Sequence, residues 1–208
     1  MKKLIFLSFI IIVAGFLMSY QVTHALFSDT ATATNNAFTA AAEFPETPSA
    51  TGSSTIVINE VSAIGGNDLD WVELYNKTGS PIDISGWKVS DNGGGTDAFP
   101  TGSVIPANGF AVIVANGSSL LVPGTALRIE LPTPTIGSSG LNPDGDRVLL
   151  EDSANNDIDA ISFGADTTYF TLPAITSTNS LARQNNGQDT DSSSDWALDI
   201  SPSLGVGN

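Results

Sequence analysis

Short apolar stretches that alternate with a period of two recur from residue 56 onward, and they constrain the fold more than any other feature. Such alternation gives a strand one buried and one wetter face, and no window shows a sustained helical period. Clusters of Gly, Asn, Asp and Pro separate the stretches, as turns between short strands require. The sequence therefore predicts an all-β sandwich or barrel, with strands at residues 56–61, 71–75, 82–89, 110–114, 126–129, 147–151, 158–163 and 180–183.

The clearest pair of stretches covers residues 71–75 and 82–89. Val72 and Leu74 alternate with polar or aromatic neighbours in the first stretch, and Ile82 and Ile84 share one face of the second. The gap between them consists of turn residues that include a proline, which blocks helix continuation. This pattern predicts two neighbouring strands of an antiparallel sheet, joined as a hairpin.

The N-terminal residues have the pattern of a secretory leader. Lys2 and Lys3 precede an apolar run over residues 4–17, and Thr23-His24-Ala25 resembles a cleavage site. The run is shorter than the roughly 20 residues that a membrane span needs. An uncleaved anchor that extends through Tyr20 is the alternative, and then the leader alone would contact a membrane. Either form predicts a secreted or cell-surface protein.

Three segments follow from these patterns. Residues 1–25 form the predicted signal peptide, and residues 26–54, rich in Ala, Thr, Ser and Pro, form a predicted flexible linker. Residues 55–208 form one predicted β-domain, which is long enough to bury a sizeable core.

Composition excludes several classes of function. The chain has no cysteine, and its one histidine, His24, lies in the predicted leader, so thiolate chemistry and imidazole catalysis are absent from the predicted mature domain. The net charge is −15, with 22 acidic against 7 basic residues, and loss of Lys2 and Lys3 with the leader makes it still more negative. Such a surface repels phosphate backbones, so we expect no direct binding of nucleic acid.

Two family resemblances add to this interpretation. Residues 2–40, with Phe27-Ser28-Asp29-Thr30 and the later Asn35-Asn36-Ala37-Phe38-Thr39-Ala40, resemble the N-terminal region of camelysin/TasA-type exported proteins. The remainder resembles the lamin tail domain in ordered motifs at residues 58–61, 70–76, 82–87, 99–110, 142–150, 158–163, 180–183 and 201–208. Residues 133–141 have no counterpart in that family pattern.

The lamin tail resemblance implies an immunoglobulin-like β-sandwich that acts as an exported, non-enzymatic structural or interaction module. Its end loops sit on a rigid scaffold, which makes residues 91–97 and 133–141 the candidate contact regions. The expected partner is a protein or another cell-surface component. We expect no cofactor, with calcium as the alternative considered next.

Two acidic constellations provide alternatives. Asp189, Asp191 and Asp195 have the alternate spacing of oxygen ligands for calcium, although the glycine and the glutamate of a complete EF-hand loop are missing. Glu60 and Glu73 lie on successive predicted strands, and a carboxylate pair in a cleft is the requirement of a glycoside hydrolase. We favour polar cross-strand packing for this pair.

A third alternative is carbohydrate binding by exposed aromatic rings. Trp71, Trp87 and Trp196, with Tyr75 and Tyr169, would form the platform. Tryptophan at period-two positions of a sandwich is more often core or rim packing, which is the interpretation we favour.

Overall fold

The computed structural model describes residues 54–64, 69–176 and 178–208. The predicted signal peptide (1–25) and residues 26–53 of the predicted linker lie outside these described residues. The described part is built from β-strands and turns, with no α-helix and one short 3-10 turn, η1 (Ser193–Asp195). The predicted all-β immunoglobulin-like sandwich is confirmed.

One sheet has six strands in the spatial order β12-β11-β1-β2-β7-β8. All neighbours in it run antiparallel except β7 and β8, which are parallel. The strands are β1 (Ile56–Ser62), β2 (Trp71–Asn76), β7 (Phe110–Val114), β8 (Leu127–Glu130), β11 (Ser180–Arg183) and β12 (Trp196–Asp199).

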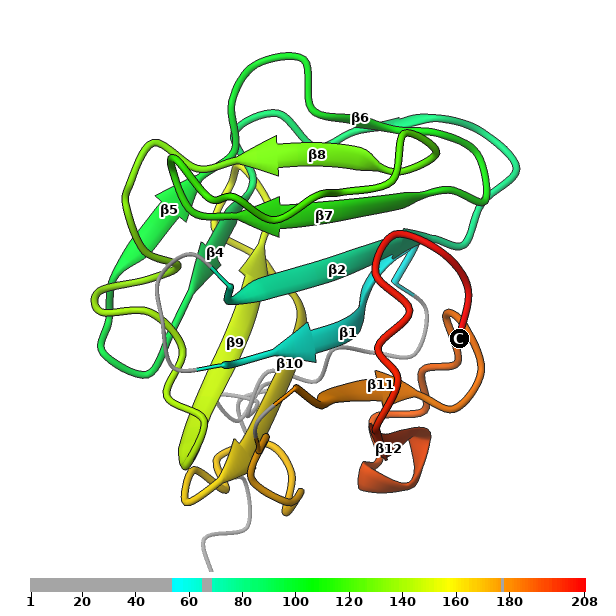
Figure 1. Cartoon of the computed structure of the whole chain (residues 1–208). Coiled ribbons are helices and arrows are strands. Elements are labelled where there is room, and N and C mark those ends of the chain that lie inside the picture. Colours follow the sequence, from blue (N-terminus) through cyan, green and yellow to red (C-terminus); the bar gives the residue numbers. More distant parts are fainter. Residues whose placement is uncertain (1–53, 65–68, 177) are drawn as a thin grey trace, which may run out of the picture. The chain divides into compact units, whose positions relative to one another are not determined.

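The second sheet has four antiparallel strands in the order β10-β9-β4-β5, and it lies behind the first sheet in the view of Figure 1. A separate two-stranded ribbon pairs β3 with β6. The strands are β3 (Ile82–Asp83), β4 (Lys88–Ser90), β5 (Thr96–Ala98), β6 (Val104–Ile105), β9 (Gly145–Glu151) and β10 (Asp157–Gly164).

The main core lies between the six-stranded and four-stranded sheets. Each sheet contributes the apolar side chains of one face, as expected for strands with one buried side. Burial of these side chains is the main term that stabilises a chain without disulfides. The core includes Ile56, Ile58, Val72, Leu74, Ile113, Val89, Val148, Leu150, Ile161 and Phe163.

The predicted hairpin of residues 71–75 and 82–89 is wrong. β2 pairs with β1 and β7, whereas the second stretch divides into β3 and β4, which belong to two other sheets. Gly86, with φ +74, lies between these two short strands, and a left-handed residue interrupts an extended segment. The period-two pattern located the strands but not their partners.

The outer face of the six-stranded sheet carries a second, smaller apolar cluster. Trp71, Val112 and Val114 alternate with the inward residues of β2 and β7, and they are fully or almost fully buried. Leu120 and Val122 pack over them from the β7–β8 connection, and Leu204 packs over them from the C-terminal segment. This sheet is therefore covered on both faces over β2 and β7.

Candidate functional site

A β-bulge in β1 places the predicted glutamate pair. The pairing register of β1 with β2 shifts between Ile58 and Glu60, so Asn59 is the extra residue. Both Ile58 and Val61 therefore reach the main core, and Glu60 turns to the outer face of the sheet. There it lies directly opposite Glu73 in the register.

The C-terminal segment closes over these two carboxylates. The Gly205 amide donates a hydrogen bond to Glu73 Oε2 at 2.6 Å, and the Ser203 amide lies 3.3 Å from both oxygens of Glu60. Asn59 Nδ2 donates to Glu73 Oε1 at 2.9 Å. We call this set of residues, Asn59, Glu60, Glu73, Ser203 and Gly205, the tail clamp.

Neither glutamate of the tail clamp is exposed. Desolvation by burial raises the pKa of Glu73 to about 8, against the opposing effect of the hydrogen bonds from Asn59 and Gly205. Burial also raises the pKa of Glu60. A hydrolytic pair needs a cleft that admits substrate, and here the C-terminal segment fills that position. The arrangement supports the cross-strand packing interpretation and gives no support to the hydrolase alternative.

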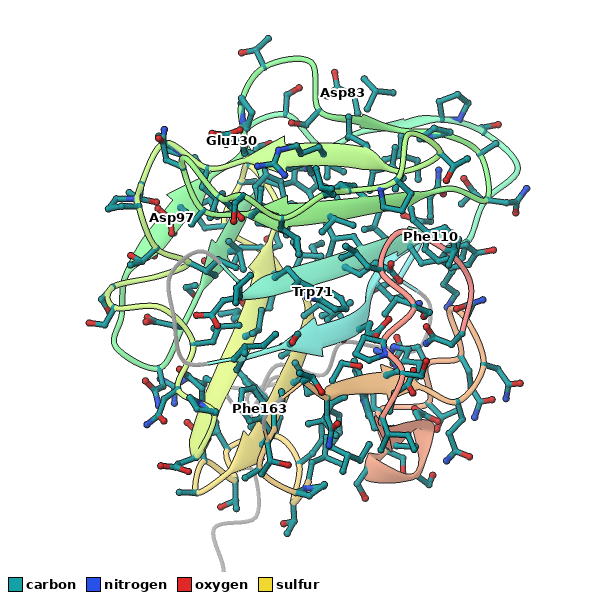
Figure 2. The ribbon with its side chains drawn as sticks, in the orientation of Figure 1. Trp71, Asp83, Asp97, Phe110, Glu130 and Phe163 are labelled. Atoms are coloured by element: carbon teal, nitrogen blue, oxygen red, sulfur yellow. The ribbon has the colours of Figure 1, made fainter. Side chains whose placement is uncertain are left out.

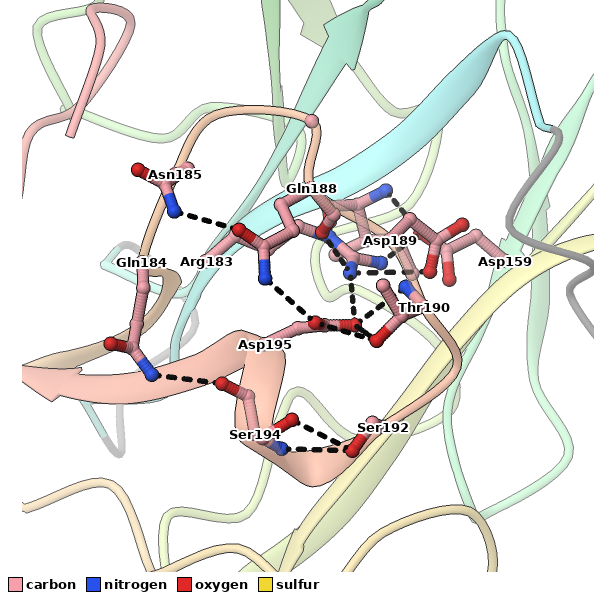
Figure 3. Close-up of polar contacts among 12 residues, drawn as sticks. Asp159, Arg183, Gln184, Asn185, Gln188, Asp189, Thr190, Ser192, Ser194 and Asp195 are labelled. Atoms are coloured by element: carbon pink, nitrogen blue, oxygen red, sulfur yellow. Dashed lines mark hydrogen bonds and ion pairs between the residues drawn. The ribbon is translucent and has the colours of Figure 1, made fainter.

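Arg183 organises a second buried polar group at the other edge of β1 (Figure 3). Its side chain is 1% exposed, and Nη2 lies 2.8 Å from Asp159 Oδ2. Nη1 lies 3.3 Å from Asp189 Oδ1 and 3.7 Å from Asp195 Oδ2. The guanidinium also lies 4.5 Å from the centre of the Trp196 ring. We call Arg183 and these three aspartates the Arg183 cluster.

The Arg183 cluster connects the two sheets. Arg183 Nε donates to the Ile58 carbonyl at 2.7 Å, and the Ile58 amide donates to Asp159 Oδ2 at 2.7 Å. Desolvation raises the pKa of Asp159 to about 6, although the nearby Arg183 charge acts to lower it. β11, β1 and β10 are thus tied together through one cation and one carboxylate.

Two of the three predicted calcium ligands therefore face a protein cation. Asp189 and Asp195 approach Arg183, whereas Asp191 is exposed and has a left-handed φ of +53. Among the described residues no group of three or more acidic or histidine side chains is arranged to hold a metal ion. One oxygen of Asp189 accepts no hydrogen bond from the described residues. Calcium binding stays a prediction, in which the ion would compete with Arg183 for these carboxylates.

The two predicted contact loops prove to be one unit. Asp91 Oδ2 accepts the Ser138 amide at 2.9 Å, and Asp97 Oδ2 accepts the Gly137 amide at 2.7 Å. A Cβ added to Gly95 would lie 2.2 Å from the Ser138 nitrogen, so the loops approach too closely for a side chain there. We call residues 91–97 and 133–141 the loop platform, which lies at the end of the sandwich marked by Asp97 in Figure 2.

Two further aspartates fix the borders of the loop platform. Asp146 accepts the Asn92 amide at 3.0 Å and the Asn142 amide at 2.8 Å. Asp70 accepts the Leu141 amide at 2.9 Å. A buried carboxylate that accepts backbone amides holds a loop in one conformation, because both the charge and the amides would be unsatisfied if it moved.

An open polar hollow of about 440 Å³ borders the loop platform. The loop platform contributes one lining residue, and the segment after β10 contributes most of the others. The lining residues are Asn92, Gly145, Ala165, Asp166, Thr167 and Thr168.

The three tryptophans form no exposed platform for a sugar, and Tyr75 and Tyr169 are each half-buried. Trp71 is 3% exposed and Trp196 is 5% exposed, and Trp87 packs partly buried against the main core. Packing, the interpretation favoured from the sequence, is what the structure shows for these three rings. Carbohydrate binding through exposed tryptophans has no support.

Sequence reasoning missed the ion pair between Arg183 and Asp159 that organises the Arg183 cluster. The sequence places Arg183 in the strand motif at 180–183 and makes it a candidate partner of the glutamate pair, and it gives no indication that Asp159 is its partner. A signal was present, because Arg183 is the one basic residue between positions 148 and 208. An isolated cation in an apolar strand of an acidic chain indicates a buried ion pair.

The family model described as Lamin Tail Domain matches residues 49–165, which is more than half of the 208 residues. No curated protein matches the chain.

Within the described residues, no helix is long and apolar enough to cross a membrane.

Proposed function

Because the chain belongs to the lamin tail domain family, whose members have a non-catalytic immunoglobulin-like fold, we propose that it is an exported structural or interaction module. It acts at the cell surface or outside the cell, and its partner is a protein or another surface component. The loop platform is its contact surface. Export rests on the leader pattern of residues 1–25.

The observation that carries the proposal is the pre-organisation of the loop platform. Asp91 and Asp97, which are 5% and 3% exposed, accept amides from the facing loop. Asn92, Ser138 and Ser139 are exposed on the same loops. A surface whose backbone is already fixed loses little conformational entropy on binding, so more of the contact energy appears as affinity.

The other polar groups do not offer such a surface. The glutamates of the tail clamp are covered by the chain's own C-terminal segment, and the aspartates of the Arg183 cluster surround a buried cation. These groups hold the fold together. The loop platform combines exposed polar side chains with a fixed backbone, which is the usual arrangement of a binding site on a rigid scaffold.

A matched pair of cross-linking positions tests this function. A photoreactive amino acid replaces Ser139 on the loop platform or, as the control, Ser119 in the β7–β8 connection, and both positions are exposed. Cells that make the full chain are irradiated intact. We expect cross-linked surface proteins at position 139 and few at position 119. Equal cross-linking at both positions would refute the loop platform as the contact surface.

Export is tested on the same cells. Protease added outside intact cells should degrade a cell-surface chain, and a secreted chain should appear in the medium. A chain that stays inside the cells and is protected from external protease would overturn the proposed location, whatever the cross-linking shows.

A further inference from the structure

The four edge strands of the two sheets differ in how they are protected. An unprotected edge presents backbone N–H and C=O groups to which another strand can add. The edge at β10 is covered, because the Gly164 amide donates to the Leu172 carbonyl at 3.0 Å and Ser162 Oγ donates to the Phe170 carbonyl at 3.0 Å. The edge at β5 is covered by the loop platform, through Asp97 and Gly137.

The remaining edges, β8 and β12, belong to the six-stranded sheet. β8 carries a charge pair, since Arg128 Nε lies 3.5 Å from Glu130 Oε2, and charged side chains on an edge strand discourage added strands. β12 pairs with β11 on one side, and within the described residues no strand pairs with its other side. Its Leu198 is 40% exposed, and the following Ile200 is 79% exposed.

A hollow of about 210 Å³ lies beside β12. Ala182 and Ala197 are direct cross-strand partners and both line it, so its floor consists of small side chains. Asp199, Gln184 and Asn208 also line it, together with Leu198 and with Arg183, whose side chain is 1% exposed. The lining is mainly apolar with one carboxylate, Asp199, so it suits the methylene stem of a long cationic side chain whose charged end reaches Asp199.

The chain after β11 carries only negative side-chain charges. Residues 184–208 contain four aspartates and no basic residue, and two of the aspartates, Asp191 and Asp199, lie outside the Arg183 cluster and reach the surface. Arg183, the one cation on β11, is 1% exposed and is occupied by the Arg183 cluster. Lys77 approaches the loop at Gly187 and lies outside both strands. An acidic surface next to an unprotected edge is complementary to a basic extended segment.

We propose that the outer edge of β12 binds an extended basic segment of a partner protein by strand addition. Backbone hydrogen bonds to β12 supply the affinity, and an apolar side chain of the segment packs on Leu198 and Ile200. A lysine or arginine of the segment enters the hollow and pairs with Asp199. This surface is distinct from the loop platform, and the proposal does not depend on the loop platform being a contact surface.

A second copy of this chain is the competing occupant, and charge argues against it. Pairing of β12 with β12 of another copy brings two copies of Asp199 and two acidic C-terminal segments together. Like charges brought together at an edge oppose association. We therefore favour a basic partner over self-association.

The test measures binding of fluorescent peptides to the full chain in non-ionic detergent. The probe is a ten-residue peptide that alternates lysine and valine. A second peptide replaces each lysine by glutamate, and a third keeps the lysines but replaces the valines by proline, which cannot donate backbone hydrogen bonds. We expect binding of the first peptide and at least about tenfold weaker binding of the other two.

Two protein variants locate the site. Leu198→Lys places on the edge strand β12 a positive charge, which repels the lysines of the peptide. Leu121→Lys makes the same change at an 89% exposed position in the β7–β8 connection. We expect Leu198→Lys to weaken binding of the lysine–valine peptide about tenfold and Leu121→Lys to leave it unchanged. Amide hydrogen exchange should slow at residues 196–200 when this peptide binds.

Several results would overturn the proposal. No binding of the lysine–valine peptide, or equal binding of the proline peptide, would exclude strand addition. Equal effects of Leu198→Lys and Leu121→Lys would mean that attraction is general to the acidic surface. Dimerisation of the full chain that Leu198→Lys abolishes would identify a second copy as the occupant.

Discussion

The Arg183 cluster and the tail clamp both bury carboxylates, but only the Arg183 cluster contains a cation. In the Arg183 cluster, three aspartates surround one guanidinium. In the tail clamp, two glutamates face each other across β1 and β2, and amides and hydroxyls are their donors. The pKa values reflect this difference, at about 6 for Asp159 and about 8 for Glu73.

An acidic domain without disulfides can use buried carboxylates in two ways. A cation in the group keeps a carboxylate ionised and joins segments that are distant in the sequence. Uncharged donors, amides and hydroxyls, leave the desolvation penalty of the carboxylate largely uncompensated, so a proton is favoured, yet they still fix the segment that donates them. The Arg183 cluster joins the sheets, and the tail clamp holds the C-terminal segment.

Removal of the cation should have the largest effect on stability. Arg183→Met leaves the three aspartates of the Arg183 cluster buried without a counter-charge, and loss of one partner of a buried ion pair costs roughly 3–5 kcal/mol. The free energy of unfolding at pH 7, from urea denaturation, measures the loss. Arg147→Met is the control, because Arg147 is 35% exposed and pairs with Asp166 at 3.5 Å. We expect a loss below about 1 kcal/mol for the control. Similar losses in the two variants would show that Arg183 contributes no more than a surface ion pair.

Replacement of the ionisable Glu73 in the tail clamp should remove part of the pH dependence of the free energy of unfolding. The folded-state pKa of Glu73 is raised to about 8 from 4.5, so the folded protein binds the proton more tightly than the unfolded chain. Its contribution to stability is therefore greatest below pH 4.5 and is lost as the pH rises toward 8. Between pH 5 and pH 8, titration of Glu73 should lower the free energy of unfolding of the wild-type protein by about 3 kcal/mol. Glu73→Gln should remove most of this decline with pH.

Urea denaturation of wild type and Glu73→Gln at pH 5, 6.5 and 8 measures this slope. Glu130→Gln is the control, since Glu130 is exposed and hydrogen bonding from Gly117 lowers its pKa. The control should keep the wild-type slope above pH 5. An unchanged slope in Glu73→Gln would mean that the amides hold Glu73 ionised.

Asp159 should also make stability decline as the pH rises, but over a lower pH range than Glu73. Its folded-state pKa is raised from 3.8 to about 6, so its contribution is present below pH 3.8 and is lost as the pH rises to about 6. Asp159→Asn should remove a decline of roughly 2 kcal/mol in the free energy of unfolding between pH 4 and pH 6. From pH 6 to pH 8 the variant should show the same change of stability with pH as the wild type. Urea denaturation across both windows measures this. A slope that persists above pH 6 and disappears in the variant would mean that Arg183 fails to lower the pKa of Asp159.

The sequence predicted the strands better than their partners. Alternation located β1, β2, β7, β9, β10 and β11, because each has one face in the main core. It failed at residues 82–89, where the chain turns at Gly86 and passes between sheets. It also missed β12, because an edge strand with exposed Ala197 and Leu198 carries no clear alternation.

The buried polar groups depended on contacts that no local pattern contains. Glu60 reaches the outer face because of the bulge at Asn59, and that bulge exists only in the register with β2. Asp189 and Asp195 were recognised as an acidic pattern, yet the cation that faces them comes from Arg183 on another element. The contact loops were predicted separately, and the bond between Asp91 and Ser138, 47 positions apart, makes them one unit.

The loop platform also contains buried carboxylates, and these are held mainly by amides near the surface. Substitution here should change the free energy of unfolding least. Ser138 Oγ lies 3.1 Å from both oxygens of Asp91, while the Ser138 and Gly95 amides also donate to this carboxylate. Ser138→Ala removes the hydroxyl alone, so we expect a loss of about 1 kcal/mol in the free energy of unfolding at pH 7. Ser139→Ala is the matched control on the same exposed loop and should change stability less. A loss as large as that of Arg183→Met would show that the hydroxyl, rather than the amides, compensates the buried charge of Asp91. A loss near 1 kcal/mol, with cross-linking at position 139 retained, would show that amides suffice to keep the loop platform in its binding conformation.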